Sequence, residues 1–166
     1  MKKIFFIVVL FTAISIQHSF AQDNTKTTSL SALLNSYLDI KNALVATDAA
    51  TASVKAGELA KAIEGIDMKA LSEADHNAFM PLNEKLAFDA RHISESKDIS
   101  HQREHFSALS NNIYKLAKAV KLSTGPVYQE YCPMKKMYWL SSEAAIKNPY
   151  YGKAMLTCGK VTETIE

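Results

Sequence analysis

The feature that most constrains this chain is an apolar repeat with helical spacing that runs through residues 28–122. Apolar residues recur there at steps of three and four, which is the period of amphipathic α-helices and not of strands. Four stretches follow one another, with the stripes Leu30, Leu33, Leu34, Tyr37, Ile40 and Leu44; Ala52, Ala56, Leu59, Ala60 and Ile63; Phe79, Leu82, Leu86, Ala90 and Ile93; and Ile99, Gln102, Phe106, Leu109, Ile113, Leu116 and Val120. The sequence therefore predicts four helices.

The ends of these helices also have recognisable signals. Residues that favour the N-cap position precede the last three stripes: Asp48, Ser72, and Asp98 or Ser100. Gly65 follows the second stripe, where a helix can end. Pro81 lies inside the third stripe and predicts either a kink or the true start of that helix. Four helices with short connections favour an up-down-up-down bundle.

The composition changes after residues 123–126. Residues 127–166 hold both cysteines, the single tryptophan, five of the seven tyrosines and three of the six methionines. So short a segment cannot build its own core, and we expect it to pack across the bundle. Within it we expect short strands at 127–132 and 160–165, paired as a ribbon, a turn at 148–152, and one or two helical turns at 141–146.

The fold class we predict is therefore all-α. The expected architecture is an up-down four-helix bundle, formed by residues 28–122, with an irregular C-terminal segment, residues 123–166. A small two-stranded ribbon is an option within that segment.

The N-terminus has the three parts of a secretory signal. They are a positive n-region, an apolar core and a cleavage site with small residues: Lys2 and Lys3, residues 4–16, and Ser19 to Ala21. We expect residues 1–21 to be cleaved, leaving 22–166 as a single domain in the periplasm or secreted. The alternative is an uncleaved anchor, although the apolar core is shorter than the roughly 20 residues that span a bilayer.

The charge balance argues against a polyanionic partner. The chain has 19 Lys and Arg against 17 Asp and Glu, and removal of Lys2 and Lys3 with the signal makes the two totals equal. A neutral chain lacks the basic surface that tracks phosphates, so nucleic-acid binding is not expected. We also expect no membrane span after signal cleavage, because no other apolar stretch is long enough.

The candidate chemistry lies in the sulfur-containing residues of the C-terminal segment. Cys132, Met134 and Met137 lie within six residues of one another, and Met155 and Cys158 form a second group. Thiolate and thioether sulfurs are soft ligands that select Cu(I) over Mg, Ca or Mn. The pattern therefore predicts a Cu(I) site in which both cysteines are joined by one or two methionines.

A different interpretation of the same residues stays open. In an oxidising compartment, Cys132 and Cys158 are also expected to form a disulfide. Such a bond would stabilise the fold by about 3 kcal/mol for a loop of this length. The chain would then be a structural or protein-interaction domain without metal, and the methionines would fill gaps in its core.

The histidines offer a second candidate set of ligands. His101 and His105 are four residues apart and can share one face of the fourth helix, while His92 lies at the end of the preceding helix. Imidazole suits Cu(II) or Zn. The alternative is that these are ordinary surface histidines.

The sequence shows no complete catalytic constellation. It has no G-x-S-x-G elbow, no H-E-x-x-H pair and no P-loop. A cysteine nucleophile would need a base held beside it, and the sequence does not reveal one. We therefore predict a binding module and not an enzyme.

The C-terminal segment also resembles a known family. The segments that carry the resemblance are Tyr-Cys-Pro-Met at 131–134, Trp-Leu-Ser at 139–141, Ile-Lys-Asn-Pro-Tyr-Tyr-Gly at 146–152 and Met-Leu-Thr-Cys-Gly at 155–159. They are similar to the domain-of-unknown-function family 3347, and the helix around 102–110 looks similar too. The resemblance covers roughly residues 28–166.

This resemblance implies a cellular location and an associated transport system, but it does not imply an activity. Members are exported proteins of Gram-negative bacteria, and some are fused to, or resemble parts of, periplasmic adaptor subunits of heavy-metal efflux pumps. The Cys-Pro-Met core also resembles heavy-metal-binding segments of copper transporters, which implies metal ligation by Cys132, Met134 and Cys158, with such an adaptor as a partner in trans. The chain departs from these patterns in having Lys135 where a histidine is usual and a short segment with Met137 before Trp139.

Overall fold

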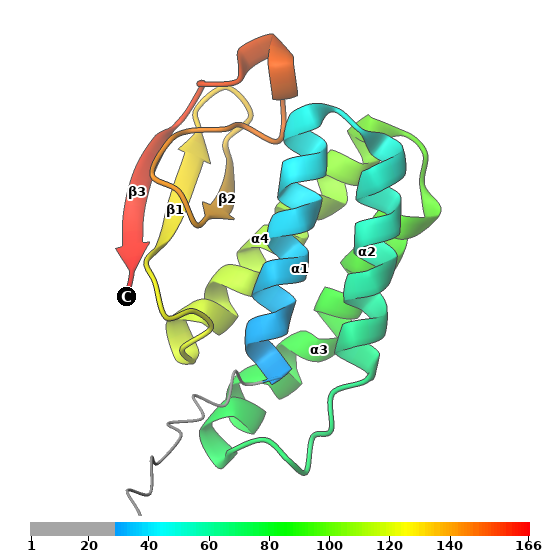
Figure 1. The fold of residues 1–166 in the computed structure, drawn as a ribbon, viewed down its shortest axis with the longest axis vertical. Helices are drawn as coiled ribbons and strands as arrows, with labels where there is room; N and C mark the ends of the chain where they lie inside the picture. The colour runs from blue at the N-terminus through cyan, green and yellow to red at the C-terminus, as the bar shows by residue number, and fades with distance from the viewer. Residues whose placement is uncertain (1–28) are drawn as a thin grey trace, which may run out of the picture.

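The computed structural model describes residues 29–166 as four helices followed by three strands (Figure 1). The helices are α1 (Ser29–Ala46), α2 (Ala49–Glu64), α3 (Glu73–Glu95) and α4 (Ile99–Ala119). Consecutive helices run in opposite directions, as the sequence predicts (Figure 1). The expected signal segment lies outside the described residues. Within residues 29–166, no helix has the length and apolar character that crossing a membrane requires.

The predicted helix caps are confirmed by their hydrogen bonds. The Asp48 carboxylate accepts from the Thr51 N–H at 2.9 Å, and the Ser72 hydroxyl accepts from the Asp75 N–H at 3.1 Å. Of the two candidates for α4, Asp98 is the cap, since its carboxylate accepts from the Ser100 N–H at 2.8 Å. Each cap satisfies one N–H group that the helix itself leaves without a partner.

Pro81 does not mark the start of a helix. The helix α3 begins at Glu73 and continues through Pro81 to Glu95, so the interpretation of this proline as the helix start is wrong. The Ser72 cap and the buried Phe79 anchor the turns that precede it.

The C-terminal segment forms a sheet, which corrects the predicted fold class. The strands are β1 (Val127–Cys132), β2 (Met137–Ser141) and β3 (Lys160–Ile165), and a short 3-10 helix, η1 (Gly152–Met155), lies before β3. The order is β2-β1-β3 and both pairings are antiparallel. The two predicted strands and their pairing are confirmed, but β2 was missed. The fold is therefore four helices with a three-stranded sheet, not all-α.

The helical turns predicted at 141–146 are also wrong. Ser141 is the last residue of β2, and the residues after it form bends without helix. The Ser141 hydroxyl accepts from the Glu143 N–H at 3.1 Å, which turns the chain away from the sheet. The turn predicted at 148–152 is present.

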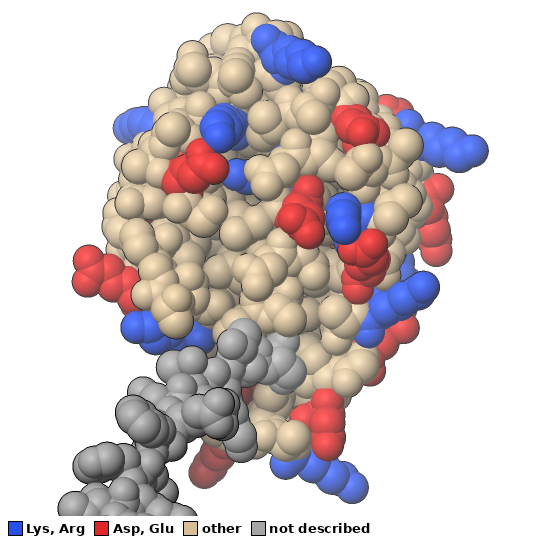
Figure 2. All heavy atoms as spheres, viewed as in Figure 1, with Lys and Arg blue, Asp and Glu red and all other residues tan. Residues whose placement is uncertain are grey.

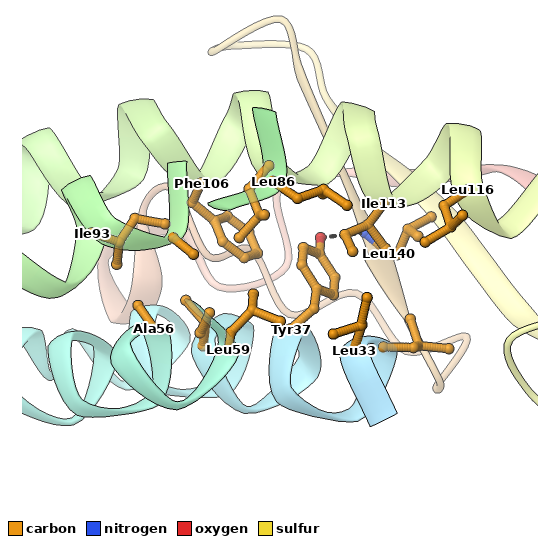
Figure 3. Close-up of a cluster of buried hydrophobic side chains, with 14 of the residues drawn as sticks. Leu33, Tyr37, Ala56, Leu59, Leu86, Ile93, Phe106, Ile113, Leu116 and Leu140 are labelled. Atoms are coloured by element: carbon orange, nitrogen blue, oxygen red, sulfur yellow. Dashed lines mark hydrogen bonds between the residues drawn. The ribbon is translucent and has the colours of Figure 1, made fainter. Parts of the chain in front are cut away.

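The core joins the bundle to the sheet, and Tyr37 lies at the junction (Figure 3). Its ring stacks on Phe106 of α4 with centroids 5.0 Å apart. Its hydroxyl bonds the Ser110 hydroxyl at 2.8 Å. The same hydroxyl accepts from the Leu140 N–H of β2 at 2.9 Å (Figure 3). One buried residue therefore links α1, α4 and the sheet.

Charged side chains of both signs lie on the face that Figure 2 shows. Lys and Arg are interspersed there with Asp and Glu, and neither sign covers that face. That face therefore does not present a strong field of one sign.

Candidate metal-binding sites

Folding brings the two cysteines together, as the metal and the disulfide hypotheses both require. Cys132 Sγ and Cys158 Sγ lie 4.0 Å apart, and both cysteines are free thiols. A disulfide has its sulfurs about 2.05 Å apart, so these two are close without being bonded. We call them the thiol pair.

The register of the sheet explains why the thiol pair meets. In the β1–β3 pairing, Tyr131 lies opposite Lys160. Cys132 is the next residue along β1, and Cys158 precedes β3 by two residues, so both thiols emerge at the same end of the sheet. Two antiparallel strands thus bring together two residues that are 26 positions apart.

The two thiols differ in their surroundings. Cys132 is fully buried in the core, whereas Cys158 is half-buried. Desolvation raises the pKa of the Cys158 thiol, and the neighbouring Cys132 raises that pKa further, while the backbone N–H of Met134 opposes the rise. Cys158 therefore holds its proton more tightly than an isolated thiol does, and a cation that binds to it must displace that proton.

Asn148 holds the loop that carries Cys158. It is fully buried, its amide donates to the Cys158 carbonyl at 2.6 Å, and its amide oxygen accepts from the Tyr150 N–H at 2.8 Å. Its own N–H donates to the Leu156 carbonyl at 2.8 Å. The sequence indicated a turn here, but it did not reveal this positioning role.

The three methionines differ in how far their side chains are exposed to solvent. Met137 is half-buried and lies opposite Cys132 in the β1–β2 register. Met134 is in the turn between β1 and β2 with 64% of its surface exposed, and Met155 ends η1 with 38% exposed. The structure thus brings the two predicted thiol ligands together, and it leaves Met134 mostly and Met155 partly exposed to solvent.

Three histidines form a second cluster, at the connection between α3 and α4. His92 comes from the last turn of α3, and His101 and His105 come from the start of α4. Their ligand nitrogens all lie within 4.8 Å of one another, and each side chain is half-buried. This arrangement can hold a metal ion, and we call it the histidine cluster.

A buried carboxylate supports the histidine cluster. Asp89 Oδ1 lies 3.0 Å from His105 Nδ1, and Asp89 is only 5% exposed. Desolvation raises the pKa of Asp89, although its bond to His105 works in the opposite direction. Asp89 was not predicted from the sequence, although an acidic residue three positions before His92 on the buried face of α3 was a usable signal.

The comparison with known proteins identifies the family. Residues 33–125 match the family described as "Protein of unknown function (DUF3347)", and this match covers more than half of the chain. The chain therefore belongs to this family. The match spans most of α1, all of α2 to α4 and the connection to β1, so it includes the histidine cluster and ends before the thiol pair. No curated protein and no solved structure matches the chain.

Proposed function

We propose that this protein is an exported binding module for a soft metal ion such as Cu(I), with Cys132 and Cys158 as its first two ligands. The observation that carries the proposal is the 4.0 Å distance between the two sulfurs. Two metal–sulfur bonds of about 2.3 Å, as in zinc thiolates, would span that distance at an angle of about 120°. The side chains of the pair therefore need little rearrangement to receive an ion.

The surroundings of the thiol pair also favour a soft ion. Thiolates select Cu(I) and related ions, and thioethers are ligands of the same kind. Met137 is the nearest thioether by register, and Met134 and Met155 are exposed side chains that can turn toward an ion. A third ligand from this set would complete a trigonal site.

The setting that we propose is the periplasm, in sequestration of the ion or its delivery to a heavy-metal efflux system. The basis for export is the signal-like segment at residues 1–21. The basis for the efflux link is the resemblance of the Cys-Pro-Met segment to heavy-metal-binding segments. A periplasmic adaptor subunit would be the partner in trans, and the module would have no catalytic step of its own.

A competition titration with Cu(I) tests the proposal. Reduced protein is titrated with Cu(I) in the presence of a competing Cu(I) chelator. The same titration is made with the Cys158→Ser variant and with the double variant that carries Cys132→Ser and Cys158→Ser. We expect each variant to bind more than about 100-fold more weakly, because even residues that only support a metal ligand cost 10–100-fold. Met80→Leu is the matched control, since Met80 is an exposed methionine on α3 and should leave the affinity unchanged. Equal affinity in the wild type and the double variant would contradict the proposal.

The second candidate function is a disulfide-stapled interaction domain. The same 4.0 Å distance favours it, because rotation of the two side chains could bring the sulfurs to bonding distance. Thiol counting on protein isolated without reductant separates the candidates. Two reactive thiols per denatured chain would contradict the disulfide, and thiols that appear only after reduction would support it.

A further inference from the structure

The histidine cluster lies apart from the thiol pair and has a different ligand chemistry. Arg103 is two residues from His101 and two from His105 on α4, and so projects from the opposite face of that helix. Its guanidinium donates to the Pro149 carbonyl at 2.8 Å, in the loop that carries Cys158. The histidines of α4 therefore face away from the C-terminal segment and toward α3.

The imidazole rings of the histidine cluster lie in direct contact. The ring centroids of His92 and His105 are 4.5 Å apart at an interplanar angle of 24°, and those of His101 and His105 are 4.7 Å apart at 66°. The His92 and His101 centroids are 6.2 Å apart. Nitrogens gathered from two helices in this way need only side-chain rotation to converge on one ion.

Asp89 prepares one of these rings for ligation. An ionised carboxylate can only accept a hydrogen bond, so the bond from His105 Nδ1 to Asp89 places the proton on Nδ1. Nε2 then keeps its lone pair for a metal. A buried carboxylate behind a ligating histidine fixes the tautomer and the ring orientation in many zinc sites.

The number of ligands sets the kind of site. Among the described residues, no fourth His, Cys, Asp or Glu joins the cluster, and all three rings are partly open to solvent. Three imidazoles suit a borderline divalent ion such as Zn²⁺, whose fourth position would be filled by water. From this geometry we infer that His92, His101 and His105 form a second metal site, for a borderline divalent ion, held independently of the thiol pair.

Cobalt(II) is a suitable probe because its spectrum reports the ligand type. The reduced full chain is titrated with Co²⁺ and then with competing Zn²⁺, beside single alanine variants of the three histidines. We expect a weak visible band without the near-ultraviolet charge-transfer band that thiolates give, and more than about a tenfold loss of affinity in each variant. His76→Ala is the matched control, because His76 lies on α3 outside the cluster, and it should bind like the wild type.

Two further variants distinguish the histidine site from the proposed thiol site and test the role of Asp89. Cys132→Ser with Cys158→Ser should keep the Co²⁺ band and the Zn²⁺ affinity. Asp89→Asn should weaken Zn²⁺ binding by about 10–100-fold and change the ¹⁵N signature of the His105 tautomer, which a merely structural role would leave unaltered. The inference is overturned if the histidine variants bind Zn²⁺ as tightly as the wild type. It is also overturned if Zn²⁺ binding is lost only when the thiols are removed. If the wild type binds neither Co²⁺ nor Zn²⁺, the inference is likewise wrong, and the histidine rings serve only to pack against one another and against Phe88, whose ring centroid lies 4.2 Å from that of His92.

Discussion

Gly152 is the residue at which the C-terminal loop meets the turn between α1 and α2. Its φ of 55° lies in the left-handed region that glycine tolerates best. A Cβ there would clash with Thr47 Oγ1 and would lie 3.0 Å from both Arg103 Nη2 and the Val45 carbonyl. The loop that carries Cys158 can therefore approach the bundle this closely only with glycine at this position.

Replacing this residue tests how far the loop depends on that contact. We expect Gly152→Ala to lower the free energy of unfolding by roughly 2–4 kcal/mol, from left-handed strain and overpacking together. Urea unfolding measures the change. Gly125→Ala is the matched control, because a Cβ at Gly125 has no neighbour within 4 Å. A loss no larger than that of the control would show that the loop is not anchored there.

At the residue scale, the sequence predicted chemistry better than contacts. Cys132 and Cys158 could be chosen as candidate ligands because sulfur-containing residues are rare and recognisable in a sequence, and the structure places their sulfurs 4.0 Å apart. Asp89, Asn148 and Gly152 were missed as supporting residues, because each acts on a neighbour that only the folded chain brings beside it. Such contacts depend on how elements pack, and helical or strand periodicity carries no information about them.

At the scale of elements, a buried acid and a buried base lie where β1 packs on the bundle. Glu130 of β1 is fully buried and Lys41 of α1 is 3% exposed. Burial raises the pKa of Glu130 to about 7, against the opposing effect of the Lys41 charge. Burial likewise lowers the pKa of Lys41. Neither Glu130 oxygen has a hydrogen-bond partner within the part of the chain that the structure describes.

This arrangement predicts a stability that depends on pH. Glu130 has an ordinary pKa of 4.5 and a folded value of about 7, so between these pH values the folded state keeps a proton that the unfolded state releases. The free energy of unfolding should therefore fall as the pH rises through that window, by up to about 3 kcal/mol.

Glu130→Gln should remove this fall, since an amide does not titrate. Urea unfolding between pH 5 and pH 8 should show a flatter profile for the variant, with its advantage over the wild type largest at the highest pH. Glu84→Gln, at an exposed position on α3, should keep the wild-type profile. Parallel profiles for the wild type and Glu130→Gln would contradict the role assigned to this carboxyl.

The elements that the sequence predicted are those with strong local signals. The helices have regular apolar stripes and side-chain caps. β1 follows the helix-breaking residues 123–126, and β3 follows Gly159. β2 was missed because its last three residues are all buried, so it lacks the alternation of a half-exposed strand. The turn before it was equally hidden, since Lys136, and not glycine or asparagine, takes the left-handed conformation with φ of 55°.

At the scale of the whole molecule, two kinds of candidate metal ligand lie on two parts of one fold. The bundle carries the imidazoles and the sheet carries the thiols, and Tyr37 joins the two parts through the core. The family match covers the bundle and ends before the thiol pair, so it does not bear on the function proposed for the sheet. Because both thiols depend on strand register, an ion bound there should also stabilise the packing of the sheet.

X-ray absorption at the copper edge of the Cu(I)-loaded protein tests the central claim most directly. We expect one copper per chain with two or three sulfur neighbours at about 2.3 Å. A first shell that contains only nitrogen or oxygen, or copper that washes out below one equivalent, would contradict a soft-metal site at Cys132 and Cys158.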